Sequence, residues 1–149
     1  GGGKTTLLRD LVRCLSAGGP GRPGLRVSLI DERGEVAVMV RGAPQMDVGP
    51  RTDVLDACPK ALGIPMALRA MNPQVIAVDE ITAEADLTAA VQATGCGVGL
   101  LATVHASDAE EMARRPLYRR LLAEGVFRLA VRIRRTESGE RIYQVEELT

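Results

Sequence analysis

The sequence predicts an α/β fold in which a mostly parallel sheet is flanked by helices and followed by a C-terminal antiparallel hairpin. Short apolar runs at Leu25 to Ile30, Val75 to Val78 and Val98 to Val104 are typical of strands buried on both faces of a parallel sheet. Segments with helical periodicity separate these runs. From residue 127 onward apolar residues alternate with arginines before a Ser138-Gly139 turn, and this pattern predicts the hairpin.

The chain begins with a glycine-rich stretch that matches the second half of the phosphate-binding loop G-x-x-x-x-G-K-[ST]. The matching residues, all candidates for nucleotide binding, are Gly1, Gly2, Gly3, Lys4, Thr5 and Thr6. Glycines let backbone amides approach a phosphate, the Lys4 ammonium supplies a cation for the β and γ phosphates, and the Thr5 hydroxyl can ligate Mg²⁺. The stretch therefore predicts a loop that binds a nucleotide together with Mg²⁺.

A helix with one apolar and one charged face follows this loop, from Thr5 to about Ala17. The first glycine of the motif, and the strand that precedes such a loop, would lie upstream of Gly1. We therefore expect residues 1–149 to form one P-loop domain that is truncated at its N-terminus and lacks its first core strand. We expect that strand to lie between the strands that end at Asp79 and His105.

Two adjacent carboxylates follow the apolar run from Val75 to Val78. In an open α/β sheet the carboxyl ends of the strands face the ligand crevice, so Asp79 and Glu80 are expected to meet the bound ligand. Taken alone, the pair could equally begin a turn or cap the next helix. The phosphate-binding loop at the start of the chain favours the interpretation as a site.

The other two buried strands also end in polar residues. If the sheet is parallel, Glu32 or Glu35 could lie near the metal ion or the attacking water, although acids at strand ends are often turn formers. The strand from Val98 runs into Thr103 and His105, the one histidine of the sequence. Either residue could sense the γ-phosphate, because their strand is expected beside the strand of Asp79; the alternative is a structural histidine.

The middle of the chain contains several prolines, and its elements are harder to predict. Val36 to Val40 is expected to form a short edge strand. Thr52 can cap a short helix through Cys58, and Pro59 suits the first turn of a longer one. Pro65 would remove a backbone hydrogen bond from that helix, so we expect a kink there or a helix that starts afresh near Pro65.

Two further helices are expected before the hairpin. One opens at Thr82 and ends at Gly95, and the other begins at the capping-box pattern Ser107-Asp108-Ala109-Glu110. Arginines in and around these segments are interpreted as surface or structural groups, with a polyanion or phosphate contact in a neighbouring subunit as the alternative. They are Arg51, Arg69, Arg114, Arg115, Arg119 and Arg120.

Composition excludes several classes of function. The 149 residues are 46% apolar with a formal net charge of zero, which indicates neither disorder nor an electrostatic grip on nucleic acid. The aromatic residues Tyr118, Phe127 and Tyr143 are too few for a platform that stacks bases. The cysteines have no metal-ligand spacing and indicate reduced core residues in a cytosolic protein. No apolar run approaches membrane-spanning length.

Together these motifs resemble the P-loop ATPases of the RecA-like and secretion-motor type, and more narrowly the stage III sporulation protein AA family of endospore-forming bacteria. The broader likeness rests on Gly3-Lys4-Thr5-Thr6, Val75 to Glu80, and Thr103-Val104-His105-Ala106. The narrower likeness rests on Asp31-Glu32-Arg33-Gly34-Glu35, Gln45 to Ala61, and Met71-Asn72-Pro73-Gln74. The resemblance covers nearly the whole chain.

The resemblance implies a RecA-like ATPase that binds and hydrolyses ATP with Mg²⁺. By this likeness Lys4 would contact phosphate, while Thr5 and Asp79 would hold Mg²⁺ directly or through water. Glu80 would polarise the attacking water, and His105 would match the histidine of the secretion motors. The family also implies a cytosolic homo-oligomeric ring, a hexamer by resemblance, peripheral to the mother-cell membrane. There it would power assembly of, or transport through, a membrane-embedded sporulation complex.

Two alternatives stay open. One is a P-loop ATPase of the type linked to a small domain that binds single-stranded nucleic acid, although these 149 residues contain no further basic domain and nucleic acid is not the expected partner. The other is a nucleotide-gated assembly protein with little turnover. The chain also departs from the family pattern, because Thr82 stands where glycine is expected and Pro65 interrupts a predicted helix.

Overall fold

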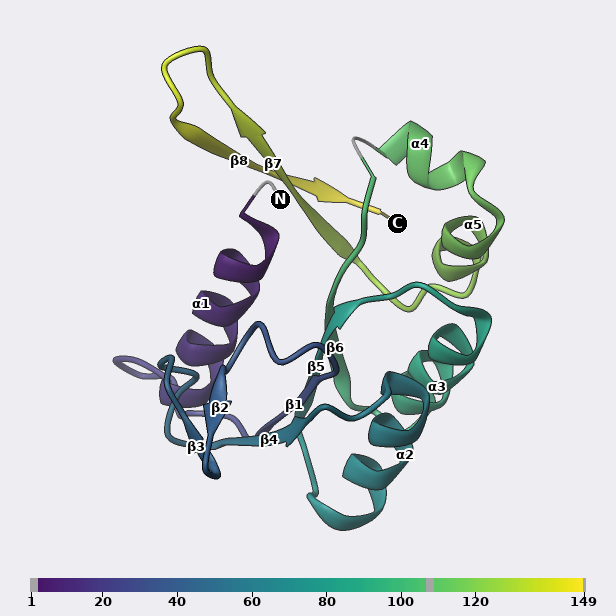
Figure 1. Ribbon diagram of the computed structural model, residues 1–149. Coiled ribbons are helices and arrows are strands. Elements are labelled where there is room, and N and C mark those ends of the chain that lie inside the picture. The colour runs from purple at the N-terminus through teal and green to yellow at the C-terminus, as the bar shows by residue number, and fades with distance from the viewer. Residues whose placement is uncertain (1–2, 107–108, 149) are drawn as a thin grey trace.

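Four parallel strands form the central sheet of the computed structural model, which describes residues 3–106 and 109–148. In spatial order they are β4 (Thr52–Asp56), β1 (Val27–Asp31), β5 (Val75–Glu80) and β6 (Gly99–Thr103) (Figure 1). Val75 pairs with Val27 on one side and with Gly99 on the other, so the strands are nearly in register. Their carboxyl ends therefore lie along one edge of the sheet.

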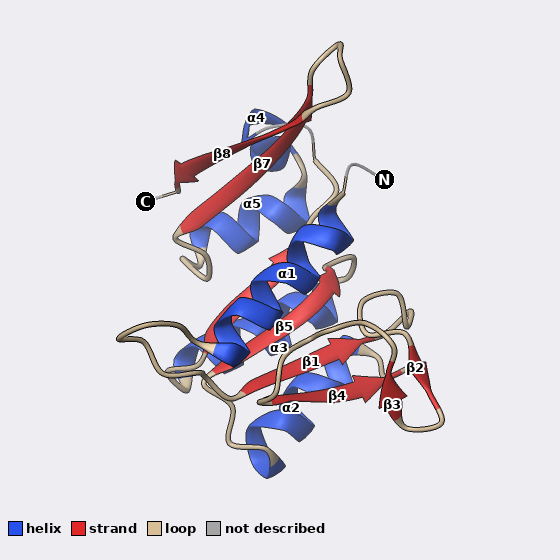
Figure 2. Ribbon diagram, turned by 90° about the vertical axis from the view of Figure 1, so that its left-hand side faces the viewer, coloured by secondary structure: helices blue, strands red, loops and turns tan. Residues whose placement is uncertain are grey.

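Helices cover both faces of this sheet (Figures 1 and 2). Helix α1 (Lys4–Ala17) packs on one face, and α2 (Lys60–Ala70) and α3 (Glu84–Gly95) pack on the other. Two separate apolar clusters result, one under α1 and one under α2 and α3. Short helices α4 (Ala109–Arg114) and α5 (Pro116–Ala123) follow, and α5 packs against α3. The expected capping residues Ser107 and Asp108 lie outside the described residues.

The C-terminal hairpin is present as expected. Strands β7 (Leu129–Arg135) and β8 (Arg141–Glu147) pair antiparallel along their full length and form a sheet of their own. The hairpin crosses the N-terminal end of α1 (Figure 1). The mostly parallel sheet flanked by helices, with this hairpin after it, confirms the predicted fold class.

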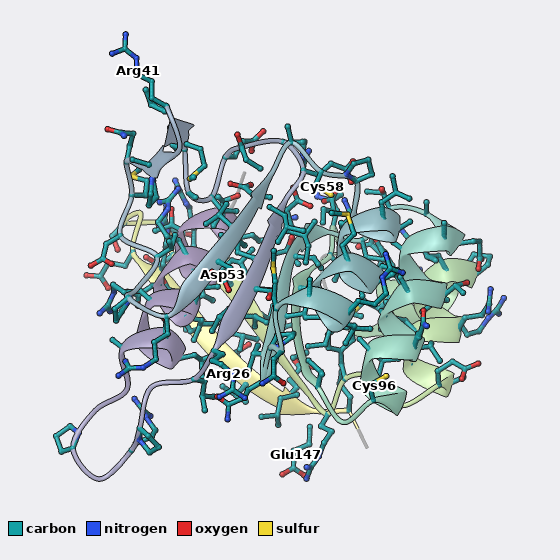
Figure 3. The ribbon with its side chains drawn as sticks, turned by 90° about the horizontal axis from the view of Figure 1, so that it is seen from below. Arg26, Arg41, Asp53, Cys58, Cys96 and Glu147 are labelled. Atoms are coloured by element: carbon teal, nitrogen blue, oxygen red, sulfur yellow. The ribbon has the colours of Figure 1, made fainter. Side chains whose placement is uncertain are left out.

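The edge strand expected from Val36 to Val40 is wrong. The residues Val36 and Ala37 are buried in the cluster under α1, and their amides donate to the carboxylate of Asp31. This hydrogen bonding folds the segment into a loop. What remains is a small separate hairpin of β2 (Met39–Val40) and β3 (Ala43–Pro44), with Arg41 projecting away from the molecule at its tip (Figure 3).

The short helix expected from Thr52 to Cys58 is also wrong, because Thr52–Asp56 is strand β4. Its backbone pairs with β1 over five positions, and the Thr52 hydroxyl donates backward to the Val48 carbonyl instead of capping a helix. Val54 packs into the cluster on one face and Leu55 into the cluster on the other. Packing on both faces outweighs the local capping signal.

Helix α2 runs through Pro65 and does not start afresh there. The proline removes a backbone hydrogen bond, at a cost of about 3 kcal/mol. Burial of Ile64 and Ala67 against the sheet offsets this, since one fully buried branched side chain contributes about 1.5–3 kcal/mol. The helix also approaches β1 closely at Gly63, where a Cβ atom would lie 2.9 Å from Ile30.

The expected gap between the strands of Asp79 and His105 is absent, since β5 and β6 pair directly. Among the described residues the sheet ends at β4 on one side, and on the other side at β6, an edge strand that pairs only with β5. A cavity of about 630 Å³ lies beside that edge, and Lys4 is at its lining. Apolar side chains from α1, β6 and β7 line it, including Leu7, Leu11, Leu101 and Val131. This cavity between β6 and β7 is a slot in which an additional strand could pair with the free edge of β6.

We predict that a strand upstream of Gly1 fills this slot in a longer form of the chain. Four or five apolar side chains buried there would contribute roughly 6–15 kcal/mol, comparable to the ~5–15 kcal/mol stability of a typical domain. Residues 1–149 alone should aggregate or melt without cooperativity, and should bind ATP poorly. A chain extended upstream should be soluble with a cooperative melt and should bind ATP. Gel filtration and thermal melts check this. A soluble 149-residue chain with a cooperative melt and micromolar ATP affinity would contradict it.

Candidate functional site

The phosphate-loop motif meets the start of α1 at Gly3, and α1 begins at Lys4. Gly3 has φ of 88°, a left-handed backbone conformation that favours glycine. A Cβ atom there would also lie 2.7 Å from the guanidinium carbon of Arg141 on β8. The backbone conformation therefore favours glycine, whereas the Arg141 guanidinium is the end of a flexible side chain and can move away. Gly1 and Gly2, which belong to the same motif, lie outside the described residues.

The Lys4 ammonium brings three of the predicted site segments together. Its Nζ donates to the Val104 carbonyl at 3.3 Å, lies 3.2 Å from Nδ1 of His105, and lies 3.8 Å from a carboxylate oxygen of Glu80. These residues come from the start of α1 and from the carboxyl ends of β6 and β5. The ammonium and the Glu80 carboxylate are both partly accessible, with side-chain exposures of 31% and 23%. This group therefore faces a space that a ligand can enter.

In a neutral His105 ring, the contact with Lys4 selects the tautomer in which Nδ1 carries no proton. A lysine ammonium has three donors and no acceptor, so Nδ1 of His105 must accept the hydrogen bond. The ring proton is then on Nε2. A ligand that draws the ammonium away would free Nδ1, and the ring would respond directly to occupancy of the loop.

Asp79 lies in a second, more buried group. Its Oδ1 accepts a hydrogen bond from Nζ of Lys60 at 3.1 Å, and its Oδ2 faces the backbone amide and the guanidinium of Arg33 at 3.4 and 4.0 Å. Lys60 Nζ also donates to Oε1 of Glu32 at 3.1 Å, and the Lys60 amide donates to the same oxygen at 3.0 Å. Lys60 thus joins the acids at the ends of β1 and β5.

The charges in this second group alter the proton affinities of its members. The hydrogen bond from the Lys60 backbone amide, helped by the Lys60 ammonium, lowers the pKa of Glu32 against the opposing effect of burial. Burial lowers the pKa of Lys60, but hydrogen bonds to Asp79 and Glu32 outweigh it, so that pKa is raised. Both groups therefore stay charged at neutral pH.

The loop between Asp31 and Ala37 determines which acid joins Asp79. Arg9 of α1 donates to the carbonyls of Val36 and Glu35 at 2.6 and 2.9 Å, which holds the loop against α1. The Glu35 side chain is exposed, whereas Glu32 is held by Lys60. Of the two acids considered for this strand end, Glu32 is the one beside Asp79.

The chemistry of these donors suits Mg²⁺ that arrives with a nucleotide. Mg²⁺ prefers oxygen ligands and usually takes one or two from protein, with the rest from phosphates and water. Within residues 3–106 and 109–148, no group of three His, Cys, Asp or Glu side chains could hold a metal ion without such help. The Thr5 hydroxyl and Oδ2 of Asp79 are the oxygens that would hold it. Two other residues predicted for the site are placed as follows. The Thr6 side chain is exposed to solvent. The backbone carbonyl of Thr103 accepts a hydrogen bond from the Ile81 amide at 3.1 Å.

The arginines considered above act mainly as surface or structural groups. Arg51 donates to the Ser16 carbonyl and joins the start of β4 to the end of α1. Arg114, Arg115 and Arg120 form ion pairs with Glu110, Glu111 and Glu84. These acids neutralise most of the cluster, which supports a solvated helical face rather than a polyanion site.

Sequence reasoning missed Lys60, Arg33 and Arg141 as neighbours of the site. The one signal for Lys60 was its place next to Pro59 at a helix start, because the start of a helix in an α/β fold can face the carboxyl edge of the sheet. Nothing in the sequence brings Arg141 to Gly3, since that contact depends on where the hairpin lies.

Comparisons with known proteins identify the family to which this chain belongs. The family model described as "Sporulation stage III, protein AA" matches residues 1–147. The chain is also 39% identical, over 143 residues, to Stage III sporulation protein AA of Bacillus subtilis (strain 168). The chain belongs to the sporulation stage III protein AA family. The match covers 96% of the chain and 47% of the relative, so the chain spans about half the length of that protein.

Secretion ATPases share the fold of this family member. The Legionella pneumophila ATPase DotB matches with a TM-score of 0.67 and 21% identity, over 98% of this chain and 42% of that one. The VirB11 ATPase from the Brucella suis type IV secretion system, solved in complex with sulphate, matches with a TM-score of 0.64 and 18% identity. This match covers 99% of this chain and 45% of that one. At these identities the likeness supports the fold alone. Separately, none of the helices in the described ranges is both long and apolar enough to cross a bilayer.

We predict that Glu32→Gln removes part of the acid sensitivity of the fold. Because the pKa of Glu32 is lowered on folding, its stabilising contribution is full above the ordinary value of 4.5 and is lost as pH falls through the lower, folded-state value. The variant should melt at a lower temperature at neutral pH, and the difference from wild type should shrink as the pH is lowered below 4.5. Thermal melts of the complete protein across this range check the prediction.

The control is Glu35→Gln, since the Glu35 carboxylate is exposed and makes no hydrogen bond to the described residues. Its melting temperature should follow that of the wild type at every pH. Equal behaviour of the two variants would contradict the role given to Glu32.

Proposed function

We propose that this chain is the catalytic core of an ATP-binding and ATP-hydrolysing motor subunit. The observation that carries the proposal is the contact of the phosphate-loop lysine, Lys4, with Glu80 and His105 at the carboxyl edge of the sheet. A cation, a carboxylate and a ring nitrogen from three separate segments meet at the end of a glycine-rich turn. These groups suit binding of a nucleoside triphosphate and attack by water.

Lys4 contacts both Glu80 and His105. A triphosphate at the loop would offer the ammonium several anionic oxygens in place of one carboxylate 3.8 Å away. Lys4 would then turn to the phosphates, and Glu80 would lose its ion pair. Nucleotide binding thus frees the carboxylate at the moment it is needed as a base.

Hydrolysis requires a water molecule to attack the γ-phosphorus. A new P–O bond forms to this water, the bond between the γ-phosphorus and the bridging oxygen breaks, and ADP leaves with the bonding electrons. Glu80 accepts the proton of the water as general base. Lys4 stabilises the charge on the phosphate oxygens. Mg²⁺, when bound, neutralises phosphate charge, and Thr5 with Oδ2 of Asp79 would hold it.

We place the activity in a homo-oligomeric ring, a hexamer in the simplest case. The likeness of the fold to secretion ATPases supports a motor, and membership of the sporulation family supports a role in sporulation. The ring would lie in the mother-cell cytoplasm, peripheral to a membrane complex, and would power its assembly or the transport through it. Arg69, exposed on α2, is a candidate for a contact with phosphate in a neighbouring subunit.

We predict that Glu80→Gln in the complete protein keeps ATP binding and lowers turnover by about 10²–10⁴-fold, since a positioned general base is typically worth that much. Binding of a fluorescent ATP analogue and release of phosphate, measured over a range of protein concentrations, check it. Wild-type turnover should rise with concentration if a ring is the active form. Hydrolysis at the wild-type rate in Glu80→Gln would remove Glu80 from this role. ATP binding without measurable wild-type turnover would favour the nucleotide-gated assembly protein.

We predict that His105→Ala lowers turnover, or the dependence of turnover on assembly, far more than it lowers nucleotide affinity. The reason is that the imidazole ring of His105 contacts Lys4, the lysine that must respond to the γ-phosphate. His105→Asn is the matched variant, since its amide oxygen can still accept a hydrogen bond from Lys4. It should retain more activity than the alanine variant. Loss of thermal stability with normal specific activity in the folded fraction would instead assign His105 a structural role.

A further inference from the structure

Lys60 is a buried cation beside the proposed site, and the chemistry above gives it no part. It is the first residue of α2, its side chain is 4% exposed, and its ammonium touches the acids Glu32 and Asp79. Burying a charge is costly unless it is paired and hydrogen-bonded. Here two carboxylates at 3.1 Å each supply the pairing.

The two carboxylates lie close together because both bind the same nitrogen. Their oxygens cannot be further apart than about twice the 3.1 Å contact, and the Asp79 side chain is only 10% exposed. The Glu32 side chain is more open, with 39% exposed, but without a cation between them two carboxylates so placed would still repel each other. An oxygen pair of this kind is also what a divalent cation binds. The ammonium occupies the place between them.

We propose that Lys60 is a positioning residue that substitutes for a divalent cation between Glu32 and Asp79. It fixes Asp79 through Oδ1, and Oδ2, which also accepts from the Arg33 amide at 3.4 Å, is the oxygen that would take the metal ion that accompanies the nucleotide. The site is thereby ordered before any ligand binds, and it does not take up a divalent cation in the absence of nucleotide. The link to nucleotide rests on the proposed function, but the bridge between the two acids does not.

The test uses the complete protein without nucleotide. Wild type and Lys60→Met are melted with and without millimolar MgCl₂ or MnCl₂. Loss of one partner of a buried ion pair should lower the melting temperature of Lys60→Met by about 10 °C. The metal ion should then raise the melting temperature of the variant and leave that of wild type unchanged, because only the variant has an open place between the acids.

Two further variants serve as controls. Lys60→Arg keeps the charge and should show no response to the metal. Lys60→Met combined with Asp79→Asn removes the ammonium and the more buried of its two carboxylates, so it should melt above Lys60→Met and lose the metal response. If Lys60→Met does not fold, the double variant still tests the proposal. A double variant that is no more stable than Lys60→Met overturns the proposal. The proposal is also overturned if Mg²⁺ without nucleotide raises the melting temperature of the wild type and Asp79→Asn abolishes this rise.

Binding of a fluorescent ATP analogue to the wild type is measured in parallel. Failure to bind it would overturn the proposed function and leave the comparison of metal responses intact. A metal response in wild type equal to that in Lys60→Met would overturn the inference about Lys60 and leave ATP binding intact. The two failures are therefore distinguishable.

Discussion

The near-register parallel pairing of β1, β5 and β6 is the constraint on which the site depends. Because Val27, Val75 and Gly99 lie side by side, the strands reach the same edge of the sheet at Glu32, Asp79 and Thr103 within a residue or two. A slip of one residue in β5 would turn every side chain to the opposite face. The apolar clusters on both faces fix the register up to Ala77, and a register shift between Ala77 and Glu80 then sets how the acids end the strand.

Asp79 and Glu80 point to opposite faces of the sheet. Regular alternation from Val78, which packs under α2 and α3, would send Asp79 to the side of α1, so the register shift in β5 between Ala77 and Glu80 decides which acid takes which face. Glu80 turns to the face of α1 and meets Lys4, whereas Asp79 turns to the face of α2 and meets Lys60. Each lysine is the first residue of its helix, so a helix N-terminus adds its positive end to the ammonium charge. The dipeptide Asp79-Glu80 is thus held by two helices on opposite sides of the sheet. The contact between Lys4 and Glu80 is partly exposed to solvent, and the contact between Lys60 and Asp79 is buried.

Buried apolar runs were sufficient to predict β1, β5 and β6 to within about two residues, because strands covered on both faces have few other sequence patterns. The same reasoning failed at Thr52–Asp56, where a capping residue and a short apolar pair suit a helix locally, and only the pairing with β1 decides for a strand. For the site, strand ends were enough to nominate Asp79, Glu80 and His105. They could not supply Lys60, whose burial depends on how α2 docks.

The bond from Lys4 to the Val104 carbonyl joins positions 100 residues apart in the chain. Contacts of such separation pay a large loop-closure entropy before they contribute stability, so they form late in folding. During synthesis, α1 must leave the ribosome and wait until β5 and β6 have both been made before its lysine finds a partner. The end of α1 that carries Lys4 therefore gains these contacts only after the sheet is complete.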